Sequence, residues 1–237
     1  MRLLPVPGVF QPPSDARMLA GHLRGELRRP GMTVLDLCTG SGFLALEAAA
    51  SGAAEVTAVD VSCRAVLAAR LNARLNGLEL RAVRGDLFEP VRGRRFDVIV
   101  SNPPYLPSPR ASLPRSGIAR ASEAGGLGRA FLDRICSAAR DHLNDGGVLL
   151  LVHSSVCGER PTLEALARSG MSPQVVARQR GPLGPLLGGR ADWLRRQGLL
   201  LDGDREEMLV IRAERCAVRH ASGRGADRIP RPRVAAG

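Results

Sequence analysis

The residues of this chain best suited to chemistry are Asn102, Pro103, Pro104 and Tyr105, which follow the apolar run at residues 96–100. The two prolines fix the backbone and remove N–H donors, so the segment is stiff and its carbonyl groups are left outside a strand ladder. The Asn102 side-chain oxygen and the Pro103 carbonyl can accept both hydrogens of a planar NH2 group, and the Tyr105 ring can lie against its face. We predict that these four residues bind an amide or an exocyclic amine, with Asn102, Pro103 and Tyr105 as catalytic residues.

The turn after the first predicted strand has the composition of a ligand-binding loop. Gly40 and Gly42 allow the backbone to approach a ligand closely, and the N-terminus of the following helix favours an anionic group. Ala45 stands at the last glycine position of the G-x-G-x-x-G pattern that would begin at Gly40, and Cys38 stands where a glycine would precede it, so the turn alone is also compatible with no ligand. The residues that we expect to contact a ligand here are Asp36, Cys38, Thr39, Gly40 and Gly42.

Acidic residues follow the next two predicted strands. Asp60 ends the second strand, 24 residues after Asp36, where a carboxylate accepts hydrogen bonds from the ribose hydroxyls of a nucleoside. Asp86 follows the third strand and can accept from the amino group of an adenine, while Leu87 packs on the ring. The set predicts a cofactor that carries a nucleoside, with Asn102 close to both the cofactor and the second substrate. A dinucleotide and S-adenosylmethionine both meet this description.

The elements that must position these residues alternate along the chain. Period-2 and continuous apolar runs predict strands at residues 33–37, 55–60, 80–83, 96–101, 147–153, 172–180 and 207–212. Helical periodicity and capping residues predict helices at residues 16–27, 43–50, 62–76, 129–143 and 161–169. This alternation predicts an α/β fold with a doubly wound, mostly parallel, seven-stranded Rossmann-like sheet. No helix is predicted between the last two strands, so we expect an antiparallel hairpin at one edge.

Composition indicates a single domain over residues 1–213, in which residues 1–30 form an arm and a helix, followed by a basic disordered tail at residues 214–237. The net charge is +11, and all 34 basic residues are arginine. Such a charge favours contact with RNA or the ribosome, although a solvated surface is the simpler explanation. The five cysteines are widely spaced without a C-x-x-C pair, which favours a reducing cytoplasmic location and no metal site. We expect no membrane segment.

Taken together, residues 36–42, Asp60, Asp86 and the Asn-Pro-Pro-Tyr segment resemble a class I S-adenosylmethionine-dependent methyltransferase of the amino-methylating type. The stretches Phe10-Gln11-Pro12-Pro13-Ser14-Asp15, 124–133 and 205–210 resemble the HemK/PrmC-like release factor glutamine methyltransferases, in the short branch that lacks a separate N-terminal helical domain. The resemblance implies S-adenosyl-L-methionine as cofactor and the N5 nitrogen of a glutamine in a peptide chain release factor as methyl acceptor. It leaves open whether an activating partner subunit is needed.

Three residues depart from the pattern of that branch. Ala16 stands where a threonine is often found, Cys38 replaces a glycine, and Ser122 stands near the position of a common aromatic residue. Two other functions therefore stay open: methylation of adenine or guanine in DNA or ribosomal RNA, and a non-enzymatic cofactor-binding protein. The Asn-Pro-Pro-Tyr segment also has a purely structural alternative, a rigid turn with Tyr105 as a cap on the core.

Overall fold

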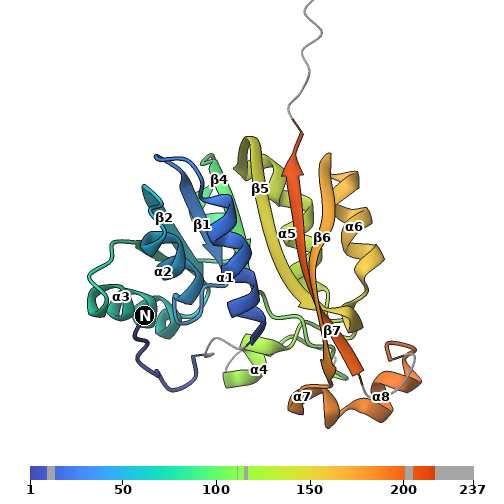
Figure 1. The fold of residues 1–237 in the computed structure, drawn as a ribbon. Helices are drawn as coiled ribbons and strands as arrows, with labels where there is room; N and C mark the ends of the chain where they lie inside the picture. Colours follow the sequence, from blue (N-terminus) through green and yellow to red (C-terminus); the bar gives the residue numbers. More distant parts are fainter. Residues whose placement is uncertain (10–13, 111, 115–116, 201–204, 217–237) are drawn as a thin grey trace, which may run out of the picture.

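The computed structural model describes residues 1–9, 14–110, 112–114, 117–200 and 205–216, which form a seven-stranded sheet in the order β3-β2-β1-β4-β5-β7-β6 (Figure 1). The strands are β1 (Thr33–Leu37), β2 (Glu55–Asp60), β3 (Arg81–Arg84), β4 (Phe96–Ser101), β5 (Leu143–Ser154), β6 (Met171–Pro182) and β7 (Arg205–Arg215). The α-helices are α1 (Ser14–Glu26), α2 (Phe43–Ala50), α3 (Cys63–Leu75), α4 (Gly117–Ser122), α5 (Ala130–Ala138), α6 (Glu159–Arg168), α7 (Pro185–Gly188) and α8 (Ala191–Arg196). Short 3-10 turns occupy Glu89–Val91, Ala139–His142 and Ser155–Cys157.

Strand pairing confirms the predicted fold class. The neighbours β3, β2, β1, β4 and β5 all run parallel, whereas β7 lies antiparallel to both β5 and β6. The strands that precede the candidate site residues are therefore four adjacent strands that end at the same edge of the sheet. Ligands of open α/β sheets bind at this carboxyl edge.

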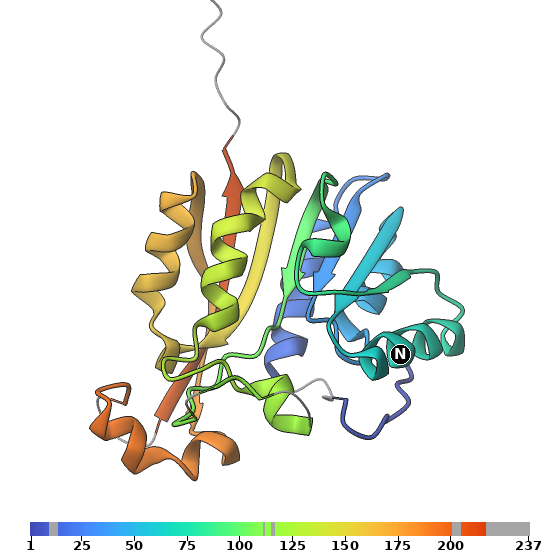
Figure 2. The same cartoon turned by 180° about the vertical axis from the view of Figure 1, so that it is seen from behind.

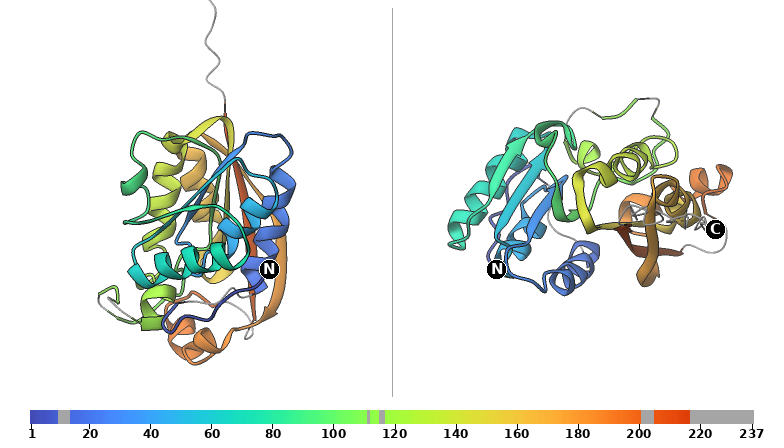
Figure 3. Two further views of the ribbon diagram at one scale, coloured as in Figure 1. Left: turned by 90° about the vertical axis from the view of Figure 1, so that its left-hand side faces the viewer. Right: turned by 90° about the horizontal axis from the view of Figure 1, so that it is seen from above.

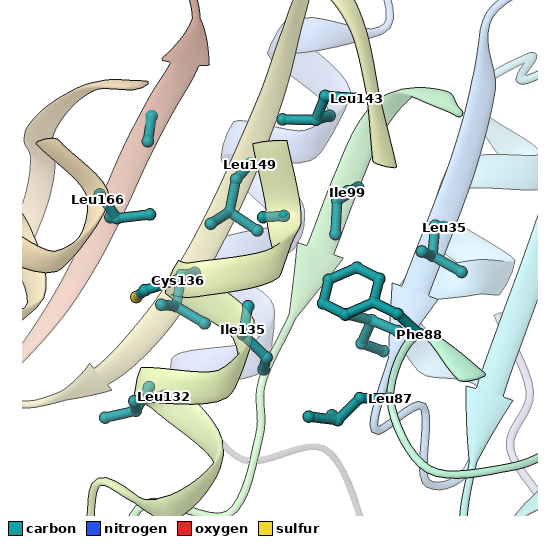
Figure 4. Packing of buried hydrophobic residues seen from close by; sticks show 14 of the residues in the cluster. Leu35, Leu87, Phe88, Ile99, Leu132, Ile135, Cys136, Leu143, Leu149 and Leu166 are labelled. Carbon is teal, nitrogen blue, oxygen red and sulfur yellow. The ribbon is translucent and has the colours of Figure 1, made fainter. Parts of the chain in front are cut away.

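The sheet separates two hydrophobic layers because successive side chains of a strand point to opposite faces. In β1, Val34 packs in a cluster with residues of α1, α2 and α3, and its neighbour Leu35 packs in a cluster with residues of α5 and α6. Figures 2 and 3 show these helices on the two sides of the sheet. Figure 4 shows the cluster that contains Leu35, to which Ile135 of α5 and Ile99 of β4 also belong. Both layers hold the strand ends in fixed positions relative to one another.

Three short helices lie in segments that the sequence predicts to be irregular. Helix α4 interrupts the expected loop at 104–126, and α7 and α8 lie between the last two strands, where no helix was expected. They have only four to six residues each, too few to produce a recognisable helical period. Leu187 of α7 and Leu194 of α8 pack with Val156 in a small separate core. Figure 1 shows all three helices at the edge where the parallel strands end.

Several predicted boundaries are wrong. Helix α5 stops at Ala138, and β5 begins at Leu143, because Leu143 already pairs with Phe96 of β4 before the register shifts. Strand β7 continues to Arg215, two residues into the predicted tail. The Arg215 guanidinium is buried, donates to the Leu143 carbonyl and pairs with Asp145 at 3.0 Å. Residues 10–13 and 217–237, which include most of the predicted tail, lie outside the described residues. No helix of the described chain has the length and apolar character that a bilayer crossing requires.

Candidate active site

A cavity of about 930 Å³ lies at the carboxyl edge of the sheet. This volume is within the usual range for a small-molecule site. The predicted site residues that line it are Cys38, Thr39, Gly40, Asp60, Asp86, Leu87, Asn102 and Pro104. The structure thus brings the predicted nucleoside-binding residues and Asn102 to one cavity. The predicted residues that do not line it are Asp36, Gly42, Pro103 and Tyr105.

Asp36 shapes the glycine turn from inside the protein. Its side chain is fully buried, and its Oδ2 accepts hydrogen bonds from Thr39 Oγ1 at 2.5 Å and from the Ala45 N–H at 3.1 Å. These bonds fix the turn between β1 and α2. Gly42 is also structural, because its φ is +86° and a Cβ there would lie 2.9 Å from the Ala69 Cα. Its lack of a side chain lets the start of α2 pack closely against α3.

The protonation of Asp36 makes a testable contribution to stability. Burial raises the pKa of Asp36 to about 7, and its Oδ1 has no hydrogen-bond partner among the described residues. An unfolded aspartate has a pKa near 3.8, so the folded state binds the proton more tightly between these two values. By linkage, the free energy of unfolding falls as the pH rises through this window, by up to ~1.4 kcal/mol per pH unit.

We expect Asp36→Asn to remove this pH dependence. The thermal midpoint of the variant, relative to that of the wild type at the same pH, should rise by roughly 4–8 °C between pH 5 and pH 7.5. Scanning calorimetry of both proteins at the two pH values measures this difference. The contributions of all other titrating groups cancel, because the two proteins share these groups. A difference that does not change with pH would show that Asp36 has an ordinary pKa.

Asp60 is built to accept hydrogen bonds at the rim of the cavity. Its Oδ2 accepts from the Gly40 N–H at 3.0 Å, and its Oδ1 accepts from the Ser62 N–H at 2.9 Å. Burial raises the pKa of Asp60, and the two backbone donors and the Arg120 guanidinium act in the opposite direction. Each carboxylate oxygen has a further lone pair for a ligand hydroxyl. The two carboxylate oxygens can therefore accept hydrogen bonds from the two hydroxyl groups of a ribose.

The third strand end holds an ion pair that the sequence did not reveal. Both oxygens of Asp86 accept from the Arg134 guanidinium of α5, at 3.1 and 2.7 Å. Asp86 must therefore share its oxygens if it also accepts from an adenine amino group. Leu87 lines the cavity with a φ of +48°, a strained conformation of the kind that clusters at ligand sites.

Cys38 adopts the left-handed conformation that usually belongs to glycine, with a φ of +58°. This explains how the turn keeps its shape although the glycine is replaced. Burial, together with the charges of Asp60, Asp36 and Asp86, raises the pKa of the Cys38 thiol well above its ordinary value. The thiol is therefore neutral at physiological pH and is not a nucleophile.

The Asn-Pro-Pro-Tyr segment is anchored by a residue that the sequence prediction did not include in the site. Asp15 of α1 is buried, and its Oδ2 accepts from the Tyr105 hydroxyl at 2.8 Å and from Asn102 Nδ2 at 3.3 Å. The sequence placed Asp15 at a helix N-cap and at the end of the stretch 10–15 that resembles the family, and it assigned no contact to its side chain. Burial and the Asp15 carboxylate raise the pKa of Tyr105 well above its ordinary value. The Tyr105 phenol is therefore directed to Asp15 and does not form the cavity wall.

The N-terminal arm forms another part of the cavity that sequence patterns did not reveal. Gly8 and Val9 line it. The arm is attached to α3, because Asn72 accepts from the Leu4 N–H at 2.7 Å and donates to the Ser41 carbonyl of the glycine turn at 2.9 Å. Figure 1 shows the arm, in dark blue, running from α3 along the edge where the strands end. An irregular arm has no periodicity, so only the folded chain shows its position.

Comparisons with known proteins identify the family. Residues 2–114 match the family model "Methyltransferase small domain". The chain is 34% identical over 181 residues to the Methanocaldococcus jannaschii protein named "Putative protein N5-glutamine methyltransferase MJ0928", a match that covers 76% of this chain and 90% of the relative. It is 32% identical over 196 residues to the release factor glutamine methyltransferase of Geobacter sulfurreducens, covering 78% of this chain and 66% of that protein.

Solved structures support the fold. The E. cuniculi Mtq2–Trm112 complex, described as responsible for methylation of the eRF1 termination factor, contains a chain with a TM-score of 0.62 and 22% identity, and the match covers 88% of this chain and 99% of that one. The T. thermophilus 16S rRNA N2 G1207 methyltransferase, solved with AdoMet and guanosine, has a TM-score of 0.55 and 25% identity, covering 89% of this chain and 46% of that one. The 34% identity to the Methanocaldococcus jannaschii protein, of which this chain covers 90%, shows that the chain belongs to the family of S-adenosyl-L-methionine-dependent protein N5-glutamine methyltransferases.

Proposed function

We propose that this protein methylates the side-chain amide nitrogen of a glutamine in a peptide chain release factor. The observation that carries the proposal is the presence of Asn102 and Asp60 on the walls of one cavity. An amide bound at Asn102 lies beside the region where Asp60 and Gly40 would hold a nucleoside. The names of the bacterial relatives, release factor glutamine methyltransferases, support the choice of a release factor.

We assign the cofactor contacts residue by residue. The Asp60 carboxylate accepts from the ribose hydroxyls, Leu87 packs on the adenine, and the turn at residues 38–40 faces the amino acid part. When bound, S-adenosyl-L-methionine supplies a methyl group on a sulfonium, which is already a strong electrophile. The difficulty of the reaction therefore lies in the nucleophile, because the lone pair of an amide nitrogen is delocalised into its carbonyl group.

The role of Asn102 and Pro103 follows from this difficulty. Asn102 lines the cavity and Pro103 follows it directly in the chain without lining it. We propose that Asn102 Oδ1 and the Pro103 carbonyl accept the two amide hydrogens and fix the nitrogen in one orientation. Such positioning contributes up to ~7–11 kcal/mol in well-oriented systems. The same acceptors favour the positive charge that develops on the nitrogen. Pro104 contributes to the cavity wall, and Tyr105 supports the segment from behind through Asp15. The proton leaves after the transfer, to water.

We expect Asp60→Ala to weaken cofactor binding about 100-fold, because two hydrogen bonds to a charged acceptor are lost together. Asp60→Asn keeps one acceptor oxygen and should lose less. Calorimetric titration with S-adenosyl-L-methionine measures both affinities. An unchanged affinity in the alanine variant would refute the assignment of Asp60 to the ribose.

To identify the methyl acceptor, the purified protein is incubated with labelled S-adenosyl-L-methionine and each substrate of a panel in turn. The panel contains a release factor, the same factor with the glutamine of its Gly-Gly-Gln loop changed to glutamate, ribosomal protein uL3, ribosomal RNA and DNA. Labelling of the release factor that disappears in the glutamate variant supports the proposal. Protein uL3 is included because relatives named uL3 glutamine methyltransferases are 43% identical over 124 residues. Labelling of uL3 or a nucleic acid alone would refute the release factor as substrate.

A second subunit that activates the enzyme is the next point to test, since the Mtq2 structure is a complex with Trm112. Chain purified from its native cells and passed through a size-exclusion column will show whether a second subunit accompanies it. Activity that appears only in the larger species would support a required partner. Full activity of the single chain would refute one.

A further inference from the structure

Three hydrogen-bond donors converge on the buried carboxylate of Asp15. Its Oδ2 accepts from Asn102 Nδ2 at 3.3 Å and from the Tyr105 hydroxyl at 2.8 Å, and its Oδ1 accepts from the Ala16 N–H at 2.8 Å. Asp15 is only 3% exposed, and it precedes Asn102 by 87 residues. Both oxygens are therefore occupied, and one of them connects α1 to the Asn-Pro-Pro-Tyr segment.

An ionised carboxylate can only accept hydrogen bonds, whereas an asparagine side chain both donates and accepts. The end of the Asn102 amide that faces Asp15 must therefore be its NH2 group. The Asn102 oxygen is then the end left for a ligand, and no hydrogen bond within the described part of the chain uses it. Without Asp15, rotation of the amide by half a turn would exchange the two ends and present a donor to the substrate.

We propose that Asp15 is a positioning residue that holds the Asn102 amide with its oxygen toward the methyl acceptor. The proposal rests on the proposed function, because it assumes that the acceptor presents an NH2 group to Asn102. Asp15 acts through Asn102 and Tyr105 and does not itself touch the substrate.

Substitution by asparagine tests this role sharply. D15N provides only one oxygen, so its NH2 group must face either the Ala16 N–H or the Asn102 and Tyr105 donors. In the second case the Asn102 amide turns over, and its NH2 group opposes that of the substrate. We expect kcat to fall at least about tenfold, the equivalent of one lost hydrogen bond, while the Kd for S-adenosyl-L-methionine stays within about twofold.

The exchanged pair, D15N with N102D, is the decisive variant. The new amide at position 15 can donate to the new carboxylate at position 102 and still accept from the Ala16 N–H. The carboxylate keeps an oxygen for the substrate NH2 group. We expect the pair to recover at least about fivefold of the kcat lost in D15N, as coupled positions do. Wild-type kcat in D15N, or no recovery in the pair, would overturn the proposal.

A matched control excludes a general effect of charge on α1. Arg17 is exposed on the same helix, and R17Q also removes one charge. It should leave kcat unchanged within about twofold. A loss in R17Q equal to that in D15N would overturn the proposal.

A second measurement needs no substrate, because Tyr105 is the only tyrosine of the chain. Its ionisation is followed by absorbance near 295 nm. Burial and Asp15 hold the pKa of Tyr105 well above its ordinary value. In D15N the Tyr105 phenol should therefore ionise at a lower pH than in the wild type, whereas in R17Q it should ionise at the same pH as in the wild type. Identical titrations of D15N and wild type would refute the contact. If the wild type methylates nothing in the panel, the proposed function fails, and this titration still decides the contact.

Discussion

Asn102→Ala should abolish most methyl transfer and leave cofactor binding nearly intact. The side chain lines the cavity, and its oxygen is the acceptor that we assign to one amide hydrogen of the substrate. Losing an acceptor that fixes the nucleophile and favours the charge of the transition state costs roughly 3–4 kcal/mol, about 10²–10³ in kcat. A methyl-transfer assay and calorimetric titration with S-adenosyl-L-methionine measure the two quantities separately.

Asn144→Ala provides the matched control. Asn144 also donates its side-chain amide to an aspartate, Asp97, at 2.9 Å, but it does so near the opposite end of β4. Its replacement should leave kcat within about twofold. Full activity of Asn102→Ala would refute the mechanism. A large loss of cofactor affinity with little further loss of kcat would instead assign Asn102 to the cofactor.

The sequence predicts the strands and the residues that follow them because these signals are local. A buried parallel strand is a continuous apolar run, and the glycines, acids and prolines at its end are adjacent in the chain. The convergence of Gly40, Asp60 and Asn102 then follows from the topology alone. The prediction for Tyr105 was less complete, because an aromatic residue in a turn can face the ligand or the core.

Asp15 and Arg134 could not be identified in this way. Each reaches the site from a helix, and its partners are 87 and 48 residues away in the chain. At the start of a helix an aspartate is ordinarily an N-terminal cap or a favourable charge, so the stretch at residues 10–15 that resembles the family did not reveal which groups Asp15 contacts. The short helices α7 and α8 were not predicted for a related reason, since packing against the small core around Leu194 stabilises them more than their own sequence does.

Gly128→Ala should damage both stability and catalysis, because this glycine makes room for the backbone of the Asn-Pro-Pro-Tyr segment. Its φ is +69°, and a Cβ there would lie 2.2 Å from the Tyr105 carbonyl oxygen and 3.0 Å from Cys157 Sγ. The same carbonyl accepts a hydrogen bond from the Cys157 thiol at 2.9 Å. The added methyl group must displace this carbonyl and strain the backbone, at a cost of about 2–4 kcal/mol. We expect the thermal midpoint to fall by roughly 5–15 °C.

Catalysis should suffer beyond the loss of folded protein, since displacement of the Tyr105 carbonyl shifts Asn102 and Pro103 with it. At a temperature where the variant is fully folded, kcat should still fall at least about tenfold, with the cofactor Kd nearly unchanged. Gly125→Ala separates crowding from backbone strain. Gly125 has a similar φ of +79°, but a Cβ there meets nothing within 4 Å. It should lose only about 1 kcal/mol and keep its kcat. Equal effects of the two substitutions would show that strain alone matters and that the Tyr105 carbonyl can move without disturbing the site.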